Sequence, residues 1–328
     1  MRRIALCGLA VLFCATSNAA LSADYPPLRP AFPQQWEAPE ADPLRVEFGV
    51  RYWYSLGRQE HAVGTDRQTM DTRTHSGEVF VHVKDGLTRS YAEAFAGYGV
   101  AHEGSYAVNG GAETALPAAR LGYAGIDYAW LPLGSEAASF GMVTGYQYTN
   151  DSPDTGRVNF SNARTAADAT DTGTGWTIAN NDSKVNNFEV HSVKLGLAGK
   201  FDAGSFDILG EAAAIPYSWV SGTYGSYAAQ ASTPTSRQGS PTSINGHAYG
   251  ATGKLMVGFR PTENLAIRVG GRASYLTGQY DATWDNVTVA DPVGGATTPT
   301  VSRRSFIVNN NPFSMLRYGA LLEVAGRF

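Results

Sequence analysis

The stretch VEFGVRYWY, residues 46–54, alternates between two kinds of side chain. Every second position from Val46 to Tyr54 is apolar, whereas the positions between them include Glu47 and Arg51. Successive side chains of a β-strand point to opposite faces, so this alternation predicts a strand with one apolar and one mixed face.

The same alternation recurs in nine further segments, which predicts ten strands of about 9 to 15 residues each. These segments are residues 78–84, 91–100, 124–130, 140–148, 193–197, 206–212, 254–260, 265–275 and 316–327. The pattern slips near Ser192, and Pro216 interrupts the seventh strand. A β-bulge or a strand end is expected at each of these two positions.

The connections between the predicted strands alternate in length. The short ones are residues 84–89, 131–138, 200–205 and 260–264, and the long ones are roughly 57–75, 101–118, 151–187, 222–246 and 281–313. Tight periplasmic turns and large outer loops are typical of an all-β, antiparallel, up-and-down transmembrane β-barrel. We therefore predict such a barrel with ten strands, or twelve if a long loop contains a further hairpin, and with both ends on the periplasmic side.

A soluble β-sandwich would also contain many alternating strands. Three observations favour the membrane barrel: strands long enough to cross a bilayer, strict alternation of connection length, and aromatic residues near strand ends. The aromatic residues in question are Tyr52, Tyr54, Tyr128, Trp130, Tyr146, Tyr148, Tyr275 and Tyr318.

The N-terminal residues 1–23 have the pattern of a secretory signal peptide. Arg2 and Arg3 precede an apolar core of about a dozen residues, and small residues up to Ala23 offer a cleavage site. The apolar run is shorter than the roughly 20 residues that a spanning helix needs, which disfavours a membrane anchor. We expect a proline-rich periplasmic segment at 24–43 and a barrel at 44–328, in the outer membrane of a Gram-negative bacterium.

Composition excludes several classes of protein. The formal net charge is −4, which does not suggest a nucleic-acid partner. Both cysteines, Cys7 and Cys14, lie in the predicted signal peptide, so the remaining chain has no disulfide framework. No cofactor motif is present, and no residue spacing is typical of a metal site, so none of either is expected.

If the apolar face of the barrel meets lipid, the other face lines the lumen. The charges that we expect there as a network are Glu47, Arg51, Glu78, Glu93, Asp127, Lys194, Glu211, Lys254, Arg268, Arg272, Arg317 and Glu323. Ten strands enclose a narrow interior, in which unpaired charges would be costly. The favoured interpretation is a plugged, salt-bridged lumen; a narrow polar channel is the alternative, and a buried acid relay with a chemical role is a third.

The pattern from about residue 76 onward resembles omptins, the ten-stranded outer-membrane proteases of Gram-negative bacteria. The resemblance rests on FGMVTGYQY (140–148), on residues 194–213 and 255–281, and on the closing FSMLRYGALLEVAGRF. It implies a protease site with an acidic pair on the second outer loop facing an Asp-x-His pair on the fourth.

The omptin catalytic residues are not found in this sequence. The second predicted outer loop offers His102, Glu103 and Glu113 without closely spaced aspartates, and the fourth has no Asp, Glu or His. The terminal Phe328 also resembles the C-terminal assembly signal of outer-membrane barrels in general. It implies contact with the barrel assembly machinery, alongside membrane lipid and lipopolysaccharide.

Three hypotheses about function follow. The preferred one is a non-enzymatic outer-membrane barrel with a narrow salt-bridged lumen, whose long outer loops bind or shield something at the cell surface. The alternatives are an omptin-type protease and a small passive pore. No motif in the sequence identifies the surface ligand.

Overall fold

The structure is a computed structural model that describes residues 44–116, 118–135, 137–154, 159–160, 165–178, 181–182, 187–224, 235–294 and 297–328. The predicted signal peptide (1–23) and proline-rich segment (24–43) lie outside the described residues. No helix among the described residues is long and apolar enough to cross a membrane.

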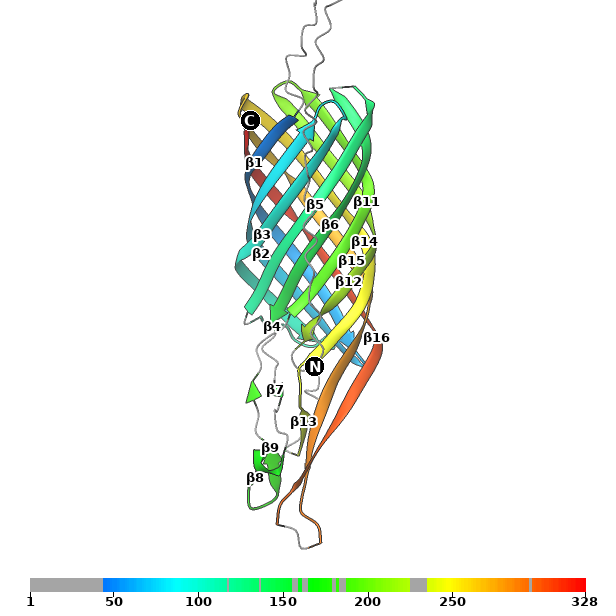
Figure 1. Ribbon diagram of the computed structural model, residues 1–328. Helices are drawn as coiled ribbons and strands as arrows, with labels where there is room; N and C mark the ends of the chain where they lie inside the picture. Colours follow the sequence, from blue (N-terminus) through cyan, green and yellow to red (C-terminus); the bar gives the residue numbers. More distant parts are fainter. Residues whose placement is uncertain are drawn as a thin grey trace, which may run out of the picture. The chain divides into compact units, whose positions relative to one another are not determined.

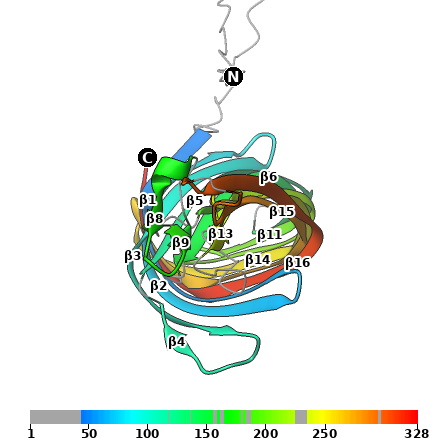
Figure 2. The same cartoon turned by 90° about the horizontal axis from the view of Figure 1, so that it is seen from below.

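Ten long strands, all paired antiparallel, form a closed ring (Figures 1 and 2). They are β1 (Leu44–Val63), β2 (Asp66–Asp85), β3 (Ser90–Val108), β5 (Ala118–Gly134), β6 (Ala138–Asp154), β11 (Asn187–Ala203), β12 (Phe206–Tyr224), β14 (Thr242–Thr262), β15 (Leu265–Ala290) and β16 (Thr300–Arg327). Each strand pairs with its sequence neighbour, and β16 pairs with both β15 and β1. The prediction of a ten-stranded up-and-down barrel is confirmed, and the sheet's remaining members, β4 (Thr114–Ala115) and β13 (Ser236–Gln238), are short.

The seam between the first and last strands leaves the ring without a free edge there. Val46 and Phe328 exchange both main-chain hydrogen bonds, at 3.2 and 2.9 Å. The rings of Phe48 and Phe328 stack with centroids 5.4 Å apart. The final residue is thus held in the wall, although its side chain faces outward and is 78% exposed.

The outer wall carries a band of exposed apolar side chains. They come from all ten strands and include Val46, Phe48, Val50, Val79, Val81, Tyr98, Ile126, Tyr128, Phe140, Met142, Leu195, Leu197, Ile208, Tyr217, Leu255, Val257, Val269, Tyr275, Tyr318, Leu322 and Val324. A continuous exposed apolar surface of this kind marks a site of contact with a membrane or with another protein. The alternation of the sequence therefore assigned the outward face correctly on these strands.

The strands are longer than the alternation predicted. They span 17 to 28 residues, because several predicted long loops are continuations of the hairpins. The connection predicted at 57–75 is a paired hairpin in which only Gly64 and Thr65 separate β1 from β2. The sequence missed these extensions because their side chains no longer alternate simply between apolar and polar.

The two expected irregularities fall where the sequence placed them. The register of β11 against β12 shifts between Val193 and Leu195, opposite Ala214 to Tyr217. Pro216 lies inside this bulge, where its missing N–H removes no ladder hydrogen bond. The prediction of a bulge at Pro216 is confirmed.

Short elements lie beyond the open end of the ring, on the side of the long connections (Figure 1). They are β7 (Asn159–Phe160), η1 (Ala166–Asp168), β8 (Ala169–Asp171), β9 (Trp176–Ile178) and β10 (Asn181–Asp182). Ile178 of β9 packs against Val287 and Val289 of β15, which joins the third outer connection to the hairpin of β15 and β16.

Candidate functional site

The inward side chains of β1 define layers along the barrel axis. From the end that carries the short turns, they run from Glu47 and Arg51 through Trp53 to Gln59 and His61. All five are buried, since at most 9% of their surface is exposed.

Arg51 is the centre of the first layer. Its guanidinium contacts Glu78 at 2.8 Å and Glu93 at 2.7 Å, and it also pairs with Glu323. Glu78 and Glu323 lie directly opposite Arg51 on the neighbouring strands β2 and β16, so strand register creates two of the three pairs, and the pair with Glu323 crosses the ring closure. The guanidinium also lies 3.8 Å from the centre of the Phe80 ring.

Arg268 forms a second centre, nearer the short turns. It contacts Glu47 at 3.0 Å, Asp207 at 3.1 Å and Glu323 at 2.6 Å. Arg260 extends the network to Asp202, with which it forms a close ion pair. Both residues lie in connections that were predicted to be short turns. Each acid in this layer therefore has at least one cationic partner.

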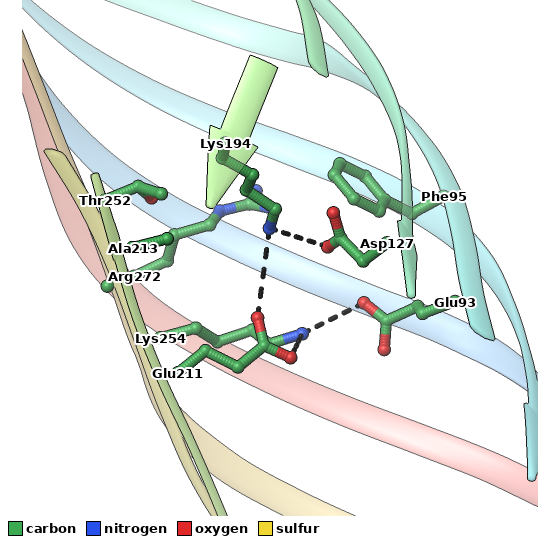
Figure 3. Close-up of a pocket in the computed structure, with 10 residues that line it drawn as sticks. Glu93, Phe95, Asp127, Lys194, Glu211, Ala213, Thr252, Lys254 and Arg272 are labelled. Carbon is green, nitrogen blue, oxygen red and sulfur yellow. Dashed lines mark hydrogen bonds and ion pairs between the residues drawn. The ribbon is translucent and has the colours of Figure 1, made fainter. Parts of the chain in front are cut away.

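The third group crosses the lumen and surrounds a small cavity (Figure 3). Lys254 contacts Glu93 at 3.0 Å and Glu211 at 3.3 Å, and Lys194 contacts Asp127 at 2.8 Å and Glu211 at 3.9 Å. The cavity measures about 20 Å³, which is space for about one water molecule. Asp127 Oδ1 has no hydrogen-bond partner within the protein, and a buried water would satisfy it.

Arg272 connects this charged zone to an aromatic one. Its guanidinium bonds to Glu78 at 3.1 Å and lies over the Trp53 ring at 3.9 Å and near Tyr123 at 5.0 Å. A cation stacked on desolvated rings gains energy that a bare pair would lack. The rings also belong to an apolar cluster with Phe80, Phe95, Leu121 and Met256, which packs beside the charges in the lumen.

Eleven of the twelve predicted lumen charges thus belong to one connected network, and the twelfth, Arg317, does not. Arg317 lies farther out and holds Asp151 at 2.6 Å, with Thr72 and Ser55 as further acceptors at 3.0 Å each. Gly57 leaves room for this guanidinium, because a Cβ there would lie 2.5 Å from it and Arg317 would have to move. Asp151 was not predicted to line the lumen, because residues 151–187 lack apolar alternation and were expected to form a loop.

The outer half of the lumen is filled by apolar side chains, which the sequence did not predict. We call this group the outer plug; it comprises Val63, Met70, Phe188, Val190, Ile215, Val220, Ile244, Ala248, Leu276, Tyr280, Ala282, Phe313 and Met315. All are at most 7% exposed. Such a packed core resembles the interior of a soluble protein, not the wall of an aqueous channel.

His61 lies within the outer plug. Its ring meets Phe188 edge-on at 4.8 Å, stacks near Phe313 at 6.1 Å and bonds to Gln59 at 3.0 Å. The exposed side chains of Arg58 and Glu60 on the outward face of β1 show that this level lies beyond the apolar band. Complete burial lowers the pKa of His61 to about 3, so the imidazole is neutral at physiological pH.

The residues that sequence analysis considered for omptin chemistry do not assemble into a site. His102 bonds to Thr74 at 3.2 Å and to the carbonyl of Gly99 at 3.2 Å. Glu103 pairs with Arg73 at 3.5 Å, and Glu113 accepts from Ser105 at 2.9 Å. In the part of the chain that the structure describes, no group of three or more His, Cys, Asp or Glu residues could hold a metal ion.

A closed antiparallel ring with an apolar outer band and charged inner face is the fold of the outer-membrane β-barrels. No family model matches the sequence, and no curated protein matches it. Among solved structures, the chain is similar to the outer membrane protease OmpT from Escherichia coli, with a TM-score of 0.56 at 10% identity, over 88% of this chain and 97% of that chain.

Two further solved structures align with lower scores. The translocator domain of the autotransporter NalP from Neisseria meningitidis has a TM-score of 0.35 at 12% identity, over 89% of this chain and 90% of that chain. The outer membrane protein OprG from Pseudomonas aeruginosa has a TM-score of 0.32 at 9% identity, over 87% and 95%. At these identities, the likeness to OmpT shows the barrel fold and nothing about activity.

Proposed function

We propose that this chain is a closed, non-catalytic outer-membrane β-barrel of a Gram-negative bacterium, with its short turns in the periplasm and its long hairpins at the cell surface. The observation that carries this proposal is the filled lumen. The inner half holds a paired charge network with a cavity of about 20 Å³, and the outer half holds the outer plug. A conducting path would have to displace both.

Conductance across planar lipid bilayers tests the closed lumen. We expect refolded protein to insert without steady current. Heat-modifiable migration on a gel, measured on the same sample, establishes that the protein is folded. A steady open-state current from such a sample would contradict the proposal and favour the passive pore.

The likeness to OmpT keeps an omptin-type protease as the second candidate. The sequence argues against it, because residues 222–246 contain no Asp, Glu or His and thus no general base. His102 is also engaged by Thr74 and Gly99. We expect no specific cleavage when refolded protein meets a peptide library with lipopolysaccharide; cleavage abolished by His102→Ala would establish the protease.

We further propose that phosphorylated lipid headgroups, such as those of lipopolysaccharide, contact the outer wall. A groove of about 680 Å³ there is lined by Leu56, Arg58, Arg73, Glu103 and Tyr318, among others. The two arginines are more than half exposed and pair with exposed glutamates, at 3.3 and 3.5 Å. Such pairs contribute little to stability, and guanidinium groups bind phosphate well.

Thermal unfolding in lipid tests this contact. We expect lipopolysaccharide to raise the midpoint above that in phosphatidylethanolamine, and the double variant Arg58→Ala/Arg73→Ala to lose most of that increment. An increment that the double variant retains in full would place the lipid contact elsewhere.

A further inference from the structure

The hairpin of β15 and β16 continues past the ring formed by the other strands (Figure 1). β15 pairs with β16 up to Ala290 and Thr300, whereas β1 pairs with β16 only as far as the pair of His61 and Phe313. Within the described residues, the segment 300–310 of β16 therefore has a paired neighbour on one side only. It is an open strand edge outside the apolar band.

The hydrogen bonds of β13 show which main-chain groups face this edge. The N–H of Gly239 donates to the carbonyl of Asp285 at 2.6 Å, so the main chain of Asp285 faces β13. Main-chain direction alternates along a strand, so Asn286 faces β16, where it lies opposite Arg304. The main-chain groups of Arg304 consequently face β15, and those of its neighbours Arg303 and Ser305 face the open edge.

The side chains along this edge are accessible. Residues 302–307 are all exposed; Ile307 is 62% exposed and Phe306 is 38% exposed. Phe306 stacks on Trp284 of β15 with centroids 6.0 Å apart, and the guanidinium of Arg304 lies 5.9 Å from the Phe306 ring. The edge therefore offers apolar and cationic contacts beside its main-chain groups.

Edge strands usually carry features that prevent another strand from pairing with them, such as short length, proline, a bulge or charged side chains. Of these, the segment 300–310 carries only the charges of Arg303 and Arg304, which repel a like-charged strand and attract an acidic one. The segment 300–310 contains no proline, and its register with β15 is unbroken from Ala282 and Val308 to Ala290 and Thr300. The opposite edge of the same hairpin already accepts a strand, because β13 pairs with residues 286–288 of β15. The hairpin is thus able to extend its sheet.

Charge selects the kind of strand that fits. Between Thr300 and Asn311 the only charged residues are Arg303 and Arg304. A second copy of this edge would bring arginines of the two chains together, and like charges on paired strands are destabilising. An extended segment with acidic side chains would instead meet opposite charges while its main chain completes the ladder.

We propose that residues 301–307 of β16 are a docking site where an extended acidic segment of a partner protein adds as a further strand. This proposal rests on the orientation proposed above, in which the long hairpins lie at the cell surface, and it names a class of partner for that end of the barrel. Its test measures peptide binding and does not depend on conductance. Failure of the docking site is therefore distinguishable from failure of the closed barrel.

Binding is measured by fluorescence anisotropy with the full chain refolded in detergent. The probe is a labelled ten-residue peptide that alternates glutamate with valine, and the same peptide with lysine in place of glutamate is the comparison. We expect the acidic peptide to bind at least tenfold more tightly, with an affinity that falls as salt rises. Amide exchange at Arg303 and Ser305 should slow on binding, since their N–H groups face the added strand.

Two variants locate the site. Ser305→Pro removes an outward N–H and leaves the bonds to β15 in place, so we expect at least a tenfold loss of affinity with unchanged thermal unfolding. Arg303→Glu/Arg304→Glu leaves the main chain intact and should reverse the preference between the two peptides. Arg67→Glu, in the exposed hairpin of β1 and β2, is the matched control and should change neither.

Several results would overturn the proposal. Affinity that persists in both Ser305→Pro and the charge-reversal variant would place the peptide elsewhere on the barrel. Absence of binding at millimolar peptide would remove the docking site altogether. Self-association of the chain that Ser305→Pro abolishes would identify a second copy as the occupant, in place of an acidic partner.

Discussion

Replacing Lys194 by methionine should destabilise the barrel by about 3–5 kcal/mol, because it leaves one buried carboxylate without its cation. Asp127 is 2% exposed, and Lys194 at 2.8 Å is the cation that it contacts. Glu211, the other neighbour of Lys194, keeps Lys254 at 3.3 Å and the hydroxyl of Tyr91 at 2.7 Å. The cost therefore falls on Asp127 alone.

A second substitution separates the loss of the pair from the loss of packing. Lys194→Met/Asp127→Asn removes the charge on both sides, so we expect it to recover most of the stability that Lys194→Met loses. Arg58→Met is the control, because its pair with Glu60 is exposed and should contribute less than about 1 kcal/mol.

The measurement is reversible unfolding from lipid vesicles in guanidinium chloride, followed by tryptophan fluorescence. The free energies of unfolding of the wild type, of Lys194→Met, of Asp127→Asn and of the double variant then form a double-mutant cycle. A Lys194→Met variant within about 1 kcal/mol of the wild type would refute the reasoning. So would a double variant less stable than either single variant.

Two further predictions use the same unfolding assay, and a third measures the fraction of folded barrel in the membrane. Because burial lowers the pKa of His61 to about 3 from 6.5, the unfolded chain binds a proton between these values that the folded barrel does not. Stability should therefore fall as pH decreases through this window, by up to about 1.4 kcal/mol per pH unit, and His61→Gln should remove that part of the slope. Gly145→Ala should cost about 1–3 kcal/mol, because its Cβ would lie 2.1 Å from Asp127 Oδ1, whereas Gly77→Ala, with nothing within 4 Å, should cost little; equal effects would contradict the packing described. Phe328→Asp should reduce the fraction of folded barrel in the membrane, because it places a charge beside Phe48 at the seam, whereas Leu87→Asp in an exposed turn should leave that fraction unchanged.

The side-chain parity of the sequence was sufficient to predict the wall and the inward charges. Glu47 and Arg51 share a parity that differs from that of the apolar residues between them, and a strand has only two faces. Parity does not give contacts across the lumen, however. Arg51 meets Glu93 two strands away, and Lys254 reaches the same carboxylate from the opposite wall, so these pairs depend on the diameter and tilt of the ring.

The outer half was not predictable in the same way. Beyond the apolar band, outward side chains such as Arg58 and Glu60 are polar, whereas many inward ones form the apolar outer plug. Apolar side chains thus face outward in the apolar band but inward beyond it. Phe313, for example, faces inward and is 3% exposed. Segments without an outward apolar face were predicted to be loops, so neither Asp151 nor the outer plug was predicted.

This reversal bears on whether the barrel can open. In the closed barrel that we propose, the inner half would exclude ions through paired charges whose separation leaves several carboxylates buried, and the outer half through close apolar packing. Movement of the outer hairpins alone would loosen the outer plug and leave the network of Arg51, Arg268 and Lys254 intact. Because the two barriers rest on different interactions and lie in series, a change that weakens one does not open the lumen. Binding at the outer end is therefore compatible with a barrel that stays closed.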